Sequence, residues 1–432
     1  MSLLVGTAVA DITPPLGGQM AGFAARRSPS ERVNDPLSAR AVAVSDGGAI
    51  SVVVALDLIA ITVDQHHAWR QRAARSAGIA ATDIVLSATH THGGPAVTPG
   101  ALGDEPDDAY LGLLEERIAD AVVEACNRME AATITQGAGL CTDVASNRRQ
   151  PSGPIDPVVP VITIGDARGA TKAVVFSYAC HPVVLGADNL ALTADWPGAA
   201  RRSIERSLPG ATAVFLQGCC GQLNTGHSAA ASMTTAPQQR RTFTEAERIG
   251  ERVAAEVLAV RVGGRSSGAA GVAVCERPVE LEFRTPGAEL AHNVDAWNAE
   301  LAEADPTRAA ILAMWLQWAA NTQGLQSSRS EATVAAHRWG DAVLSFLPGE
   351  PFVEMALDIR RATQLDHLLT AGYSGGVPGY VPYPPDAYRD GGYEIEEAHR
   401  FYGRPGVFEP VVGSRIVEAA VAAMAAVSPG RA

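Results

Sequence analysis

The sequence predicts an α/β protein whose sheets and helices are layered within one compact unit, residues 1–432. Apolar runs of strand length alternate with longer amphipathic segments along the whole chain, and this mixture is typical of layered α/β folds. The sequence contains no internal repeat and no long linker, and a short Gly/Ser-rich break at 263–268 is the one plausible seam. With 47% hydrophobic and 19% charged residues, the chain has enough apolar side chains for a large core.

Short apolar runs bounded by glycine, proline or polar residues predict the strands. Several of these runs are rich in valine and isoleucine, which favour extended backbone. The predicted strands cover 5–12, 39–44, 51–56, 84–86, 132–137, 158–164, 172–179, 213–216, 271–283, 332–339, 342–347 and 368–373.

Longer segments with apolar residues at helical spacing predict the helices. Pro197 fits the first turn of one of them, where a proline is tolerated. His66 and His67 are expected on the surface of another. The predicted helices cover 63–77, 107–129, 196–207, 244–260, 288–321 as two helices divided near Asp305-Pro306, 352–362 and 410–425.

Three loops between these elements stand out by composition. Residues 142–156 are polar, and 374–410 are rich in glycine, proline and tyrosine. The glycines of 17–27 allow the backbone to approach a ligand closely, although a flexible connector explains the same composition and is favoured on this segment alone.

Charge and hydropathy exclude several classes of partner. A net charge of −13 argues against nucleic acid or anionic membrane as a partner. The segment MSLLVGTAVADITPP lacks the basic and apolar regions of a signal peptide, and no apolar run reaches the roughly 18 residues of a membrane span. Six cysteines are too few for a disulfide framework, so we expect reduced thiols and a cytoplasmic protein.

Two histidines follow the predicted strand at 84–86. If the extended backbone persists through Thr91, the imidazoles of His90 and His92 point to the same side, because side chains repeat every second residue in a strand. Gly93-Gly94-Pro95 then ends the strand. Two such imidazoles suit a metal site in which one binds the ion and the other acts on a bound water. Two polar loop histidines without a function are the alternative.

Chemically capable side chains also follow other predicted strands. Ligand sites in α/β sheets tend to lie at the carboxyl ends of strands. Two histidines and a carboxylate with an open position suit catalytic zinc. Taken singly, His181 is more often a structural histidine and Glu350 more often a turn carboxylate. The strand-end residues that we expect near one site are Asp57, His90, His181, Asn224 and Glu350.

Seven motifs occur in a characteristic order. They are ADITPP with MAGFA, LSATHTHGGP, ASNRR, YACHPV with LTADWPG, QGCCGQLN, FLPGEPF and PGYVPYPPDAYRDGGYE. In content and order they resemble the neutral, or non-lysosomal, ceramidase family of zinc amidases. The resemblance extends from about Val5 to about Tyr402. It implies an α/β/β/α catalytic domain with two central β-sheets covered by helices on both sides.

The resemblance also implies a ligand set and a catalytic set. Zinc is expected on His90, His181, Glu350 and Tyr380, with His92 beside the zinc-bound water.

The rest of the expected catalytic set comes from three further motifs. Arg148 matches the arginine near the substrate carbonyl. Tyr393 matches a second tyrosine of the pocket, although its spacing from Tyr380 is one residue longer here. Asn224 occupies the position of the family's serine, which is proposed as nucleophile or substrate contact. Asparagine cannot be a nucleophile, but it can hydrogen-bond a substrate.

Two further departures concern the substrate. The chain is too short for the immunoglobulin-like domain that follows the catalytic domain in the ceramidases, and it lacks their secretory signal. We therefore expect a zinc-dependent hydrolase of an amide, ester or lactone in a small or medium soluble substrate, without stable membrane association. A true ceramidase is the first alternative, and a non-catalytic metal- or ligand-binding protein on the same scaffold is the second.

The expected chemistry follows from zinc. Zinc lowers the pKa of bound water to about 7, which gives a hydroxide nucleophile at neutral pH. Zinc, Arg148 and Tyr393 are expected to stabilise the oxyanion, and His92 to pass a proton to the leaving group. Asp57 and Asp195 are candidates for orienting the ligand imidazoles. A strand-end turn for Asp57 and a helix N-cap for Asp195 explain the same positions.

Three other chemistries compete with zinc hydrolysis. Gly372-Tyr373-Ser374-Gly375-Gly376 fits a nucleophile elbow with His399 downstream, but the Val377-Pro378-Gly379 segment prevents the helix that such an elbow needs. Lys172, the only lysine, would have to serve as the carbamylated lysine of an amidohydrolase barrel. Cys219 and Cys220 with His227 would form a thiol site, but adjacent cysteines after an apolar strand are more often packing residues.

Overall fold

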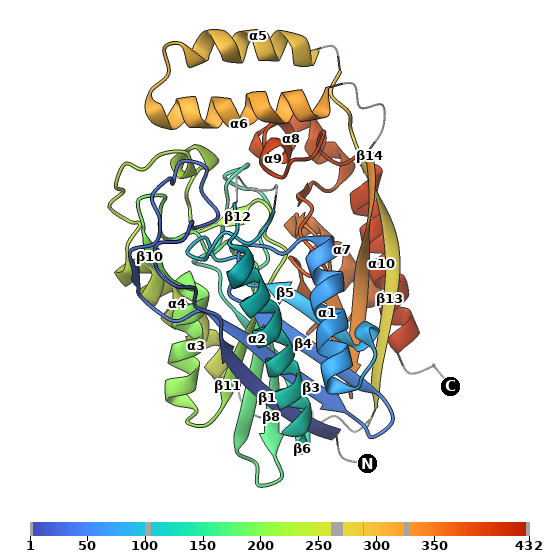
Figure 1. The fold of residues 1–432 in the computed structure, drawn as a ribbon. Coiled ribbons are helices and arrows are strands. Elements are labelled where there is room, and N and C mark those ends of the chain that lie inside the picture. The colour runs from blue at the N-terminus through green and yellow to red at the C-terminus, as the bar shows by residue number, and fades with distance from the viewer. Residues whose placement is uncertain (1–2, 100–104, 261–270, 288, 324–327, 429–432) are drawn as a thin grey trace.

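The computed structural model describes residues 3–99, 105–260, 271–287, 289–323 and 328–428 (Figure 1). The predicted seam at 263–268 lies outside the described residues. Two β-sheets pack face to face in the middle of the molecule, and helices cover the outer face of each sheet. The predicted α/β/β/α layers are therefore confirmed.

The larger sheet has eight strands and is built from the N-terminal half of the chain. β4 and β5 are parallel, as are β9 and β11, and the other neighbouring strands are antiparallel. The strand order is β11 (Thr212–Gln217), β9 (Thr171–Tyr178), β8 (Val158–Asp166), β6 (Glu130–Leu140), β1 (Leu3–Asp11), β3 (Ser38–Ser45), β4 (Ile50–Leu56) and β5 (Ile84–Ala88).

The smaller sheet has four strands and is built from the C-terminal half. Its first three strands are antiparallel, and the last pairs in parallel. The order is β13 (Val272–Phe283), β14 (Ser328–Trp339), β15 (Ala342–Phe346) and β17 (Leu369–Ala371).

The alternation of side chains along the strands explains the layers. In β4, Val52 and Val54 pack against the outer helices, while Val53 and Ala55 pack against the smaller sheet. Since successive side chains of a strand point to opposite faces, a strand covered on both sides must be apolar throughout. Burial of this kind contributes about 25 cal/mol per Å² of apolar surface removed from water.

Helices on the two outer faces complete the layers. Four of them cover the larger sheet, and two cover the smaller one. The first four are α1 (Val63–Ala77), α2 (Asp108–Asn127), α3 (Asp195–Ser207) and α4 (Phe243–Ala259), and the other two are α7 (Val353–Thr363) and α10 (Val411–Val427).

A helical hairpin lies across the top of the molecule in Figure 1, above two short helices. The hairpin consists of α5 (Glu289–Leu301) and α6 (Pro306–Thr322), and the short helices are α8 (Tyr393–Glu396) and α9 (Ala398–Phe401). Trp297, Trp315 and Trp318 of the hairpin form one buried cluster with Phe401 of α9. The hairpin therefore packs directly on the tyrosine-rich part of the chain.

Short strand pairs near the top of the sheets bring distant segments together. The pair β16–β18 is parallel and sets Glu350 opposite Tyr380, and the pair β7–β12 is antiparallel. The remaining short elements are β2 (Arg32–Val33), β7 (Ser146–Asn147), β10 (Ala191–Leu192), β12 (Leu223–Asn224), β16 (Glu350–Pro351), β18 (Tyr380–Val381) and the 3₁₀ turns η1 (Ala81–Asp83), η2 (Ala229–Ser232) and η3 (Pro385–Asp390).

The predicted helices and longer strands agree with this arrangement, with two corrections. His66 is buried rather than on the surface, because it lies on the same face of α1 as Trp69, Arg70 and Ala73. The strand predicted at 368–373 ends at Ala371. The backbone then turns toward the site.

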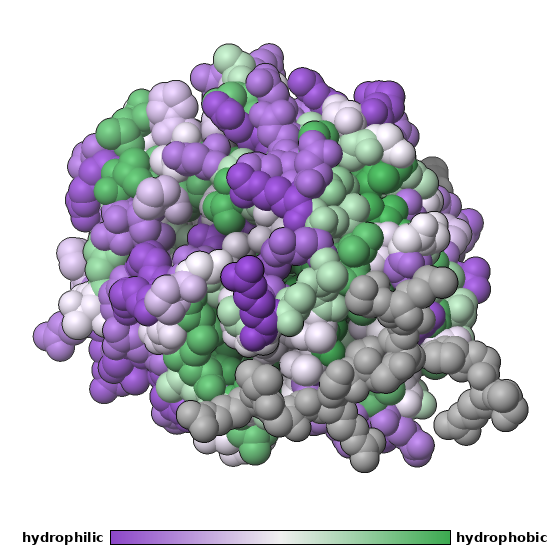
Figure 2. Space-filling model, turned by 90° about the horizontal axis from the view of Figure 1, so that it is seen from below, coloured by the Kyte–Doolittle hydropathy of each residue, from purple (hydrophilic) through white to green (hydrophobic). Residues whose placement is uncertain are grey.

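No helix among the described residues is long and apolar enough to cross a membrane. Figure 2 shows the lower face of the view in Figure 1, where hydrophilic side chains are widely spread and apolar ones lie in patches between them.

Candidate metal centre and active site

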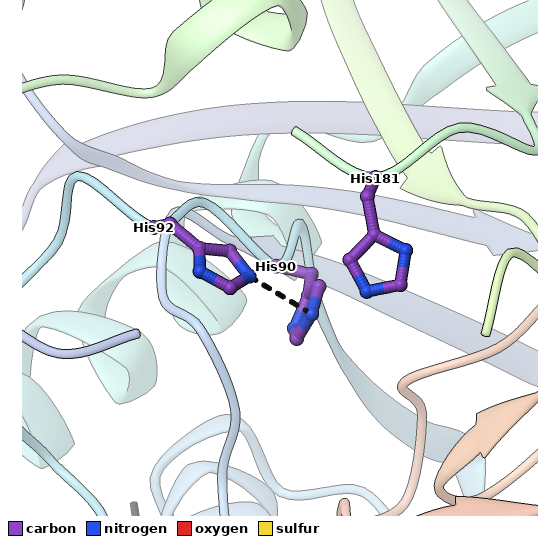
Figure 3. Close-up of side chains that lie close together, drawn as sticks. All are labelled: His90, His92 and His181. Atoms are coloured by element: carbon purple, nitrogen blue, oxygen red, sulfur yellow. Dashed lines mark hydrogen bonds between the residues drawn. The ribbon is translucent and has the colours of Figure 1, made fainter. Parts of the chain in front are cut away.

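Three of the predicted site residues converge on one point at the carboxyl ends of β5 and β9. The ligand nitrogens of His90, His92 and His181 all lie within 4.8 Å of one another. In Figure 3, His90 lies between the other two, and its Nε2 is 3.3 Å from Nε2 of His92. His90 and His181 are buried, whereas His92 is partly exposed. A group of this kind could hold a metal ion.

His90 and His92 come together by a route that the sequence did not predict. β5 ends at Ala88, and His90 has a φ of 63°, in the left-handed region that non-glycine residues rarely adopt. The argument from a continuing strand is therefore wrong, although the two rings do meet. Hydrogen bonds from the backbone N–H of Thr89 to Leu56 and from that of His90 to Leu58 hold the turn.

Backbone carbonyls orient all three imidazoles. Nδ1 of His90 lies 2.6 Å from the carbonyl oxygen of Ile59, and Nδ1 of His181 lies 2.7 Å from that of Cys220. Nδ1 of His92 lies 2.9 Å from that of Gly22. A carbonyl can only accept, so each Nδ1 carries the proton, and in the neutral ring each Nε2 presents a lone pair.

The glycine-bearing loop 17–27 therefore serves the site. Gly22 has a φ of 102°, and a Cβ there would lie 2.7 Å from Nδ1 of His92. Only glycine lets this carbonyl reach the imidazole without displacing the ring.

Neither predicted aspartate contacts a ligand imidazole. Asp57 binds Arg201 through two hydrogen bonds of 2.8 and 2.7 Å and accepts one of 3.2 Å from Thr89, next to His90. Asp195 accepts backbone N–H groups of Val184, Leu185 and Trp196. The predicted orienting role is wrong for both, because backbone carbonyls already occupy the Nδ1 atoms.

Glu350 completes the cluster of metal-type ligands. Its Oε2 lies 3.0 Å from Nε2 of His181 and 3.3 Å from Nε2 of His90. Oε2 also accepts a hydrogen bond of 3.1 Å from the Tyr373 hydroxyl, and Oε1 accepts one from the Tyr402 hydroxyl. The carboxylate is 1% exposed, so these contacts lie away from bulk water.

Tyr380 and Arg148 form one wall of the site. The ring of Tyr380 stacks on His181 with 6.4 Å between centroids and 15° between planes. Arg148 donates from Nη2 to the Tyr380 hydroxyl at 3.2 Å and from Nε to Glu394 at 2.8 Å. The ring of Tyr393 meets that of Tyr380 edge-on at 5.9 Å. The structure thus brings both predicted tyrosines and the predicted arginine to the histidines.

Burial sets the protonation states. It lowers the pKa of His181 to about 4 and holds the pKa of His92 well below its usual value, where neighbouring histidines act in the same direction. Burial raises the pKa of the Glu350 carboxyl, but His90 and His181 outweigh burial and keep the net pKa well below the usual range. Burial also holds the pKa of the Tyr380 phenol well above its usual value.

The atoms that face one another in this cluster indicate whether it could bind a metal ion. Nε2 of His90, His92 and His181 and Oε2 of Glu350 face one another at close range, and they are the atoms left to bind a cation because each Nδ1 is bonded to a carbonyl. Neutral imidazole and carboxylate are the donor set of zinc sites. The residues therefore fit zinc.

The Asn224 side chain forms hydrogen bonds within its own loop. Its Oδ1 accepts the backbone N–H groups of Gly226 and His227 at 2.9 and 3.0 Å, and its Nδ2 donates to the carbonyl of His227 at 2.6 Å. This is the side-chain-closed turn that asparagine favours. The substrate contact expected of Asn224 stays a prediction.

The competing nucleophile elbow and lysine site do not form. Ser374 is fully buried, and its hydroxyl donates to the carbonyl of Gly372 and forms a second hydrogen bond with the hydroxyl of Ser87. His399 packs against Trp318. Lys172 lies at the start of β9 and pairs with Glu130 at 2.7 Å, at the other end of the strand from His181.

The competing thiol site does not form either. Cys219 and Cys220 are buried, and burial raises the pKa of both thiols, so they stay protonated at neutral pH. A protonated thiol is a poor nucleophile.

Three residues of the site were not among the individually predicted site residues. Tyr373 and Tyr402 both bind Glu350, and Glu394 bridges Arg148 and Arg149 with hydrogen bonds of 2.8 and 3.0 Å. The tyrosine-rich composition of 374–410 was a signal for Tyr402. A buried arginine needs a carboxylate partner, and Glu394 directly follows the predicted Tyr393.

Fold and side-chain cluster together describe an α/β/β/α protein with a potential metal site at the carboxyl ends of its strands. A search of solved structures relates this fold to the neutral ceramidases. The crystal structure of neutral ceramidase from Pseudomonas aeruginosa matches with a TM-score of 0.76 and 19% identity, over 99% of this chain and 75% of that one. A ceramidase complexed with C2 matches with a TM-score of 0.75 and 17% identity, over 100% and 77%.

The chain therefore has the neutral ceramidase-like fold, as the sequence resemblance predicted. No protein-family model and no curated protein matches it.

Proposed function

We propose that the protein is a zinc-dependent hydrolase of an amide, ester or lactone bond in a small or medium soluble molecule. The observation that carries the proposal is the convergence at close range of three Nε2 atoms and Oε2 of Glu350. His90, His181, Glu350 and Tyr380 would hold Zn²⁺. When bound, the ion would polarise the scissile carbonyl and activate a water molecule for attack.

His92 is suited to move the proton. It is the only partly exposed member of the three-histidine group, and its Nε2 presents a lone pair toward the site. In the proposed reaction this atom takes the proton that the attacking water loses and delivers it to the leaving group. Gly22 keeps the ring in the required orientation through Nδ1.

Arg148 and Tyr393 are suited to stabilise negative charge on the reacting carbonyl oxygen. Glu394 fixes the Arg148 guanidinium, which lies over the rings of Tyr380 and Tyr393. Burial holds the pKa of the Tyr393 phenol above its usual value, so its O–H remains available as a donor. Preformed donors of this kind contribute several kcal/mol to transition-state stabilisation.

Chelators and covalent reagents test this chemistry. Chelation should abolish turnover, whereas serine- and thiol-directed reagents should leave most of it, because Ser374 and the adjacent cysteines are buried. A trapped acyl-enzyme on any side chain would contradict the proposal. Measured zinc binding without hydrolysis of any generic amide, ester or lactone would favour the alternative of a binding protein.

The alternative hypothesis is that the protein hydrolyses N-acylsphingosine. The structural neighbours that are named as ceramidases favour this substrate. Polar hydroxyl and guanidinium groups around the cluster favour a more polar substrate.

We also propose that residues 1–432 act as one catalytic unit in the cytoplasm. Site residues come from both halves of the chain, from Gly22 to Tyr402. All six cysteines are free thiols, which suits a reducing compartment.

A further inference from the structure

Tyr373 occupies a strained backbone position at the centre of the site. Its φ is 54°, and left-handed non-glycine residues persist only where the surroundings hold them. Its backbone N–H donates to the carbonyl of Gly349 at 3.0 Å, next to Glu350. Its own carbonyl accepts from Ala88 at 3.0 Å, at the end of β5 and two residues before His90. The backbone of Tyr373 thus joins the two segments that carry these ligands.

The Tyr373 side chain contacts the candidate ligands directly. Its hydroxyl lies 3.1 Å from Oε2 of Glu350, the oxygen that faces both histidines. Its ring lies against the imidazole of His90, with 4.3 Å between centroids. The same hydroxyl lies 3.2 Å from Sγ of Cys220, and the carbonyl of Cys220 accepts from Nδ1 of His181. One phenol therefore links Glu350, His90 and His181.

The direction of these hydrogen bonds follows from burial. Tyr373 is 0% exposed, so its hydroxyl can form hydrogen bonds only with the buried groups around it. A phenol has one proton, and the ionised carboxylate is its best acceptor. The O–H of Tyr373 therefore donates to Glu350, and the S–H of Cys220 donates to the tyrosine oxygen.

We propose that Tyr373 is a positioning residue of the metal centre, which fixes Oε2 of Glu350 and the plane of the His90 ring before the ion binds. The proposal rests on the proposed function for the identity of the ion. A fully buried phenol cannot contact a substrate, so its contacts serve the ligands. Tyr402 holds the other carboxylate oxygen, Oε1, and thereby keeps Oε2 turned toward the histidines.

The substitution Tyr373→Phe tests the proposal, because it keeps the ring against His90 and removes only the hydroxyl. Partners that orient ligands typically change metal affinity 10- to 100-fold when they are removed. We expect zinc affinity, measured by competition with a chromophoric chelator, to fall by that factor. The visible absorption bands of the cobalt(II)-substituted protein should also shift, because the carboxylate turns.

Tyr110→Phe is the matched control. Tyr110 is also a buried phenol, but it lies on α2 and donates to the carbonyl of Ile12 at 2.6 Å. Removal of the Tyr110 hydroxyl should leave zinc affinity and the cobalt spectrum unchanged. Tyr402→Phe should weaken zinc binding less than Tyr373→Phe, because Tyr402 holds the oxygen that faces away from the histidines.

The possible outcomes distinguish the positioning role of Tyr373 from the proposed zinc-dependent function. Wild-type affinity and an unchanged cobalt spectrum in Tyr373→Phe would overturn the positioning role and leave the proposed function intact. A larger loss in Tyr402→Phe than in Tyr373→Phe would also overturn it. A wild-type protein that binds no zinc would overturn both.

Discussion

The buried ion pair between Asp57 and Arg201 offers a sharp test of how the larger sheet supports the site. Arg201 reaches the carboxylate with two hydrogen bonds, and Ser38 donates to it from both its backbone N–H and its hydroxyl at 2.8 Å. Thr89, the residue before His90, donates to the same carboxylate at 3.2 Å. Asp57→Asn keeps one acceptor oxygen and places an NH₂ group against the guanidinium.

The structure gives the expected size of the effect. The side chains of Asp57 and Arg201 are 0% and 3% exposed, so the substitution leaves a buried charge without its counter-charge. Breaking such a pair costs about 3–5 kcal/mol of unfolding free energy. A chain of 432 residues has an unfolding entropy of about 0.9 kcal/mol/K, so a loss of about 4 kcal/mol should lower Tm by about 4 °C.

Calorimetry of three variants measures this effect. Asp57→Leu combined with Arg201→Met removes both charges and should recover much of the lost stability. Glu280→Gln breaks an exposed pair with Arg329 and should leave Tm within about 1 °C. Equal Tm shifts for Asp57→Asn and Glu280→Gln would refute the reasoning.

Two further predictions concern pH and substrate. Burial lowers the pKa of His337 from its usual 6.5 to about 3, so between these values the unfolded chain binds a proton that the folded chain does not, and stability falls as the pH falls. His337→Gln should remove up to about 1.4 kcal/mol per pH unit of this dependence in urea unfolding, and an unchanged slope would contradict it. For an N-acyl series of rising chain length, kcat/KM should fall beyond short acyl groups. A steady rise to C16 acyl-sphingosine would instead show a ceramidase.

Local patterns in the sequence predicted the layers because each strand and helix carries its own signal. The apolar run of β4 is buried on both faces, and this requirement is visible in its residues. His66 was misplaced because a polar residue type was given more weight than its helical spacing with Trp69 and Ala73.

The orientation of the site could not be predicted, because it depends on contacts between residues far apart in the chain. Gly22 binds His92 across 70 positions, and Glu394 binds Arg148 across 246. Asp57 carries no local sign that its partner is a buried arginine rather than an imidazole. Motif order identified His90, His181 and Glu350, whereas only the folded chain shows that backbone carbonyls orient the imidazoles.

The left-handed residues were the hardest to foresee. Histidine adopts positive φ more often than most non-glycine residues, whereas tyrosine does not, and His90 and Tyr373 both adopt it under tertiary hydrogen bonds. A strand that continued regularly through either position would point its side chain elsewhere. These two positions bring the ring of Tyr373 against the imidazole of His90.

Zinc content tests the central claim most directly. Elemental analysis of the purified protein should find one zinc per chain in the wild type and close to none in His181→Ala, because that imidazole is a proposed ligand. His292→Ala, which alters an exposed histidine of α5, should retain the full amount. Full metal retention in His181→Ala would contradict the account.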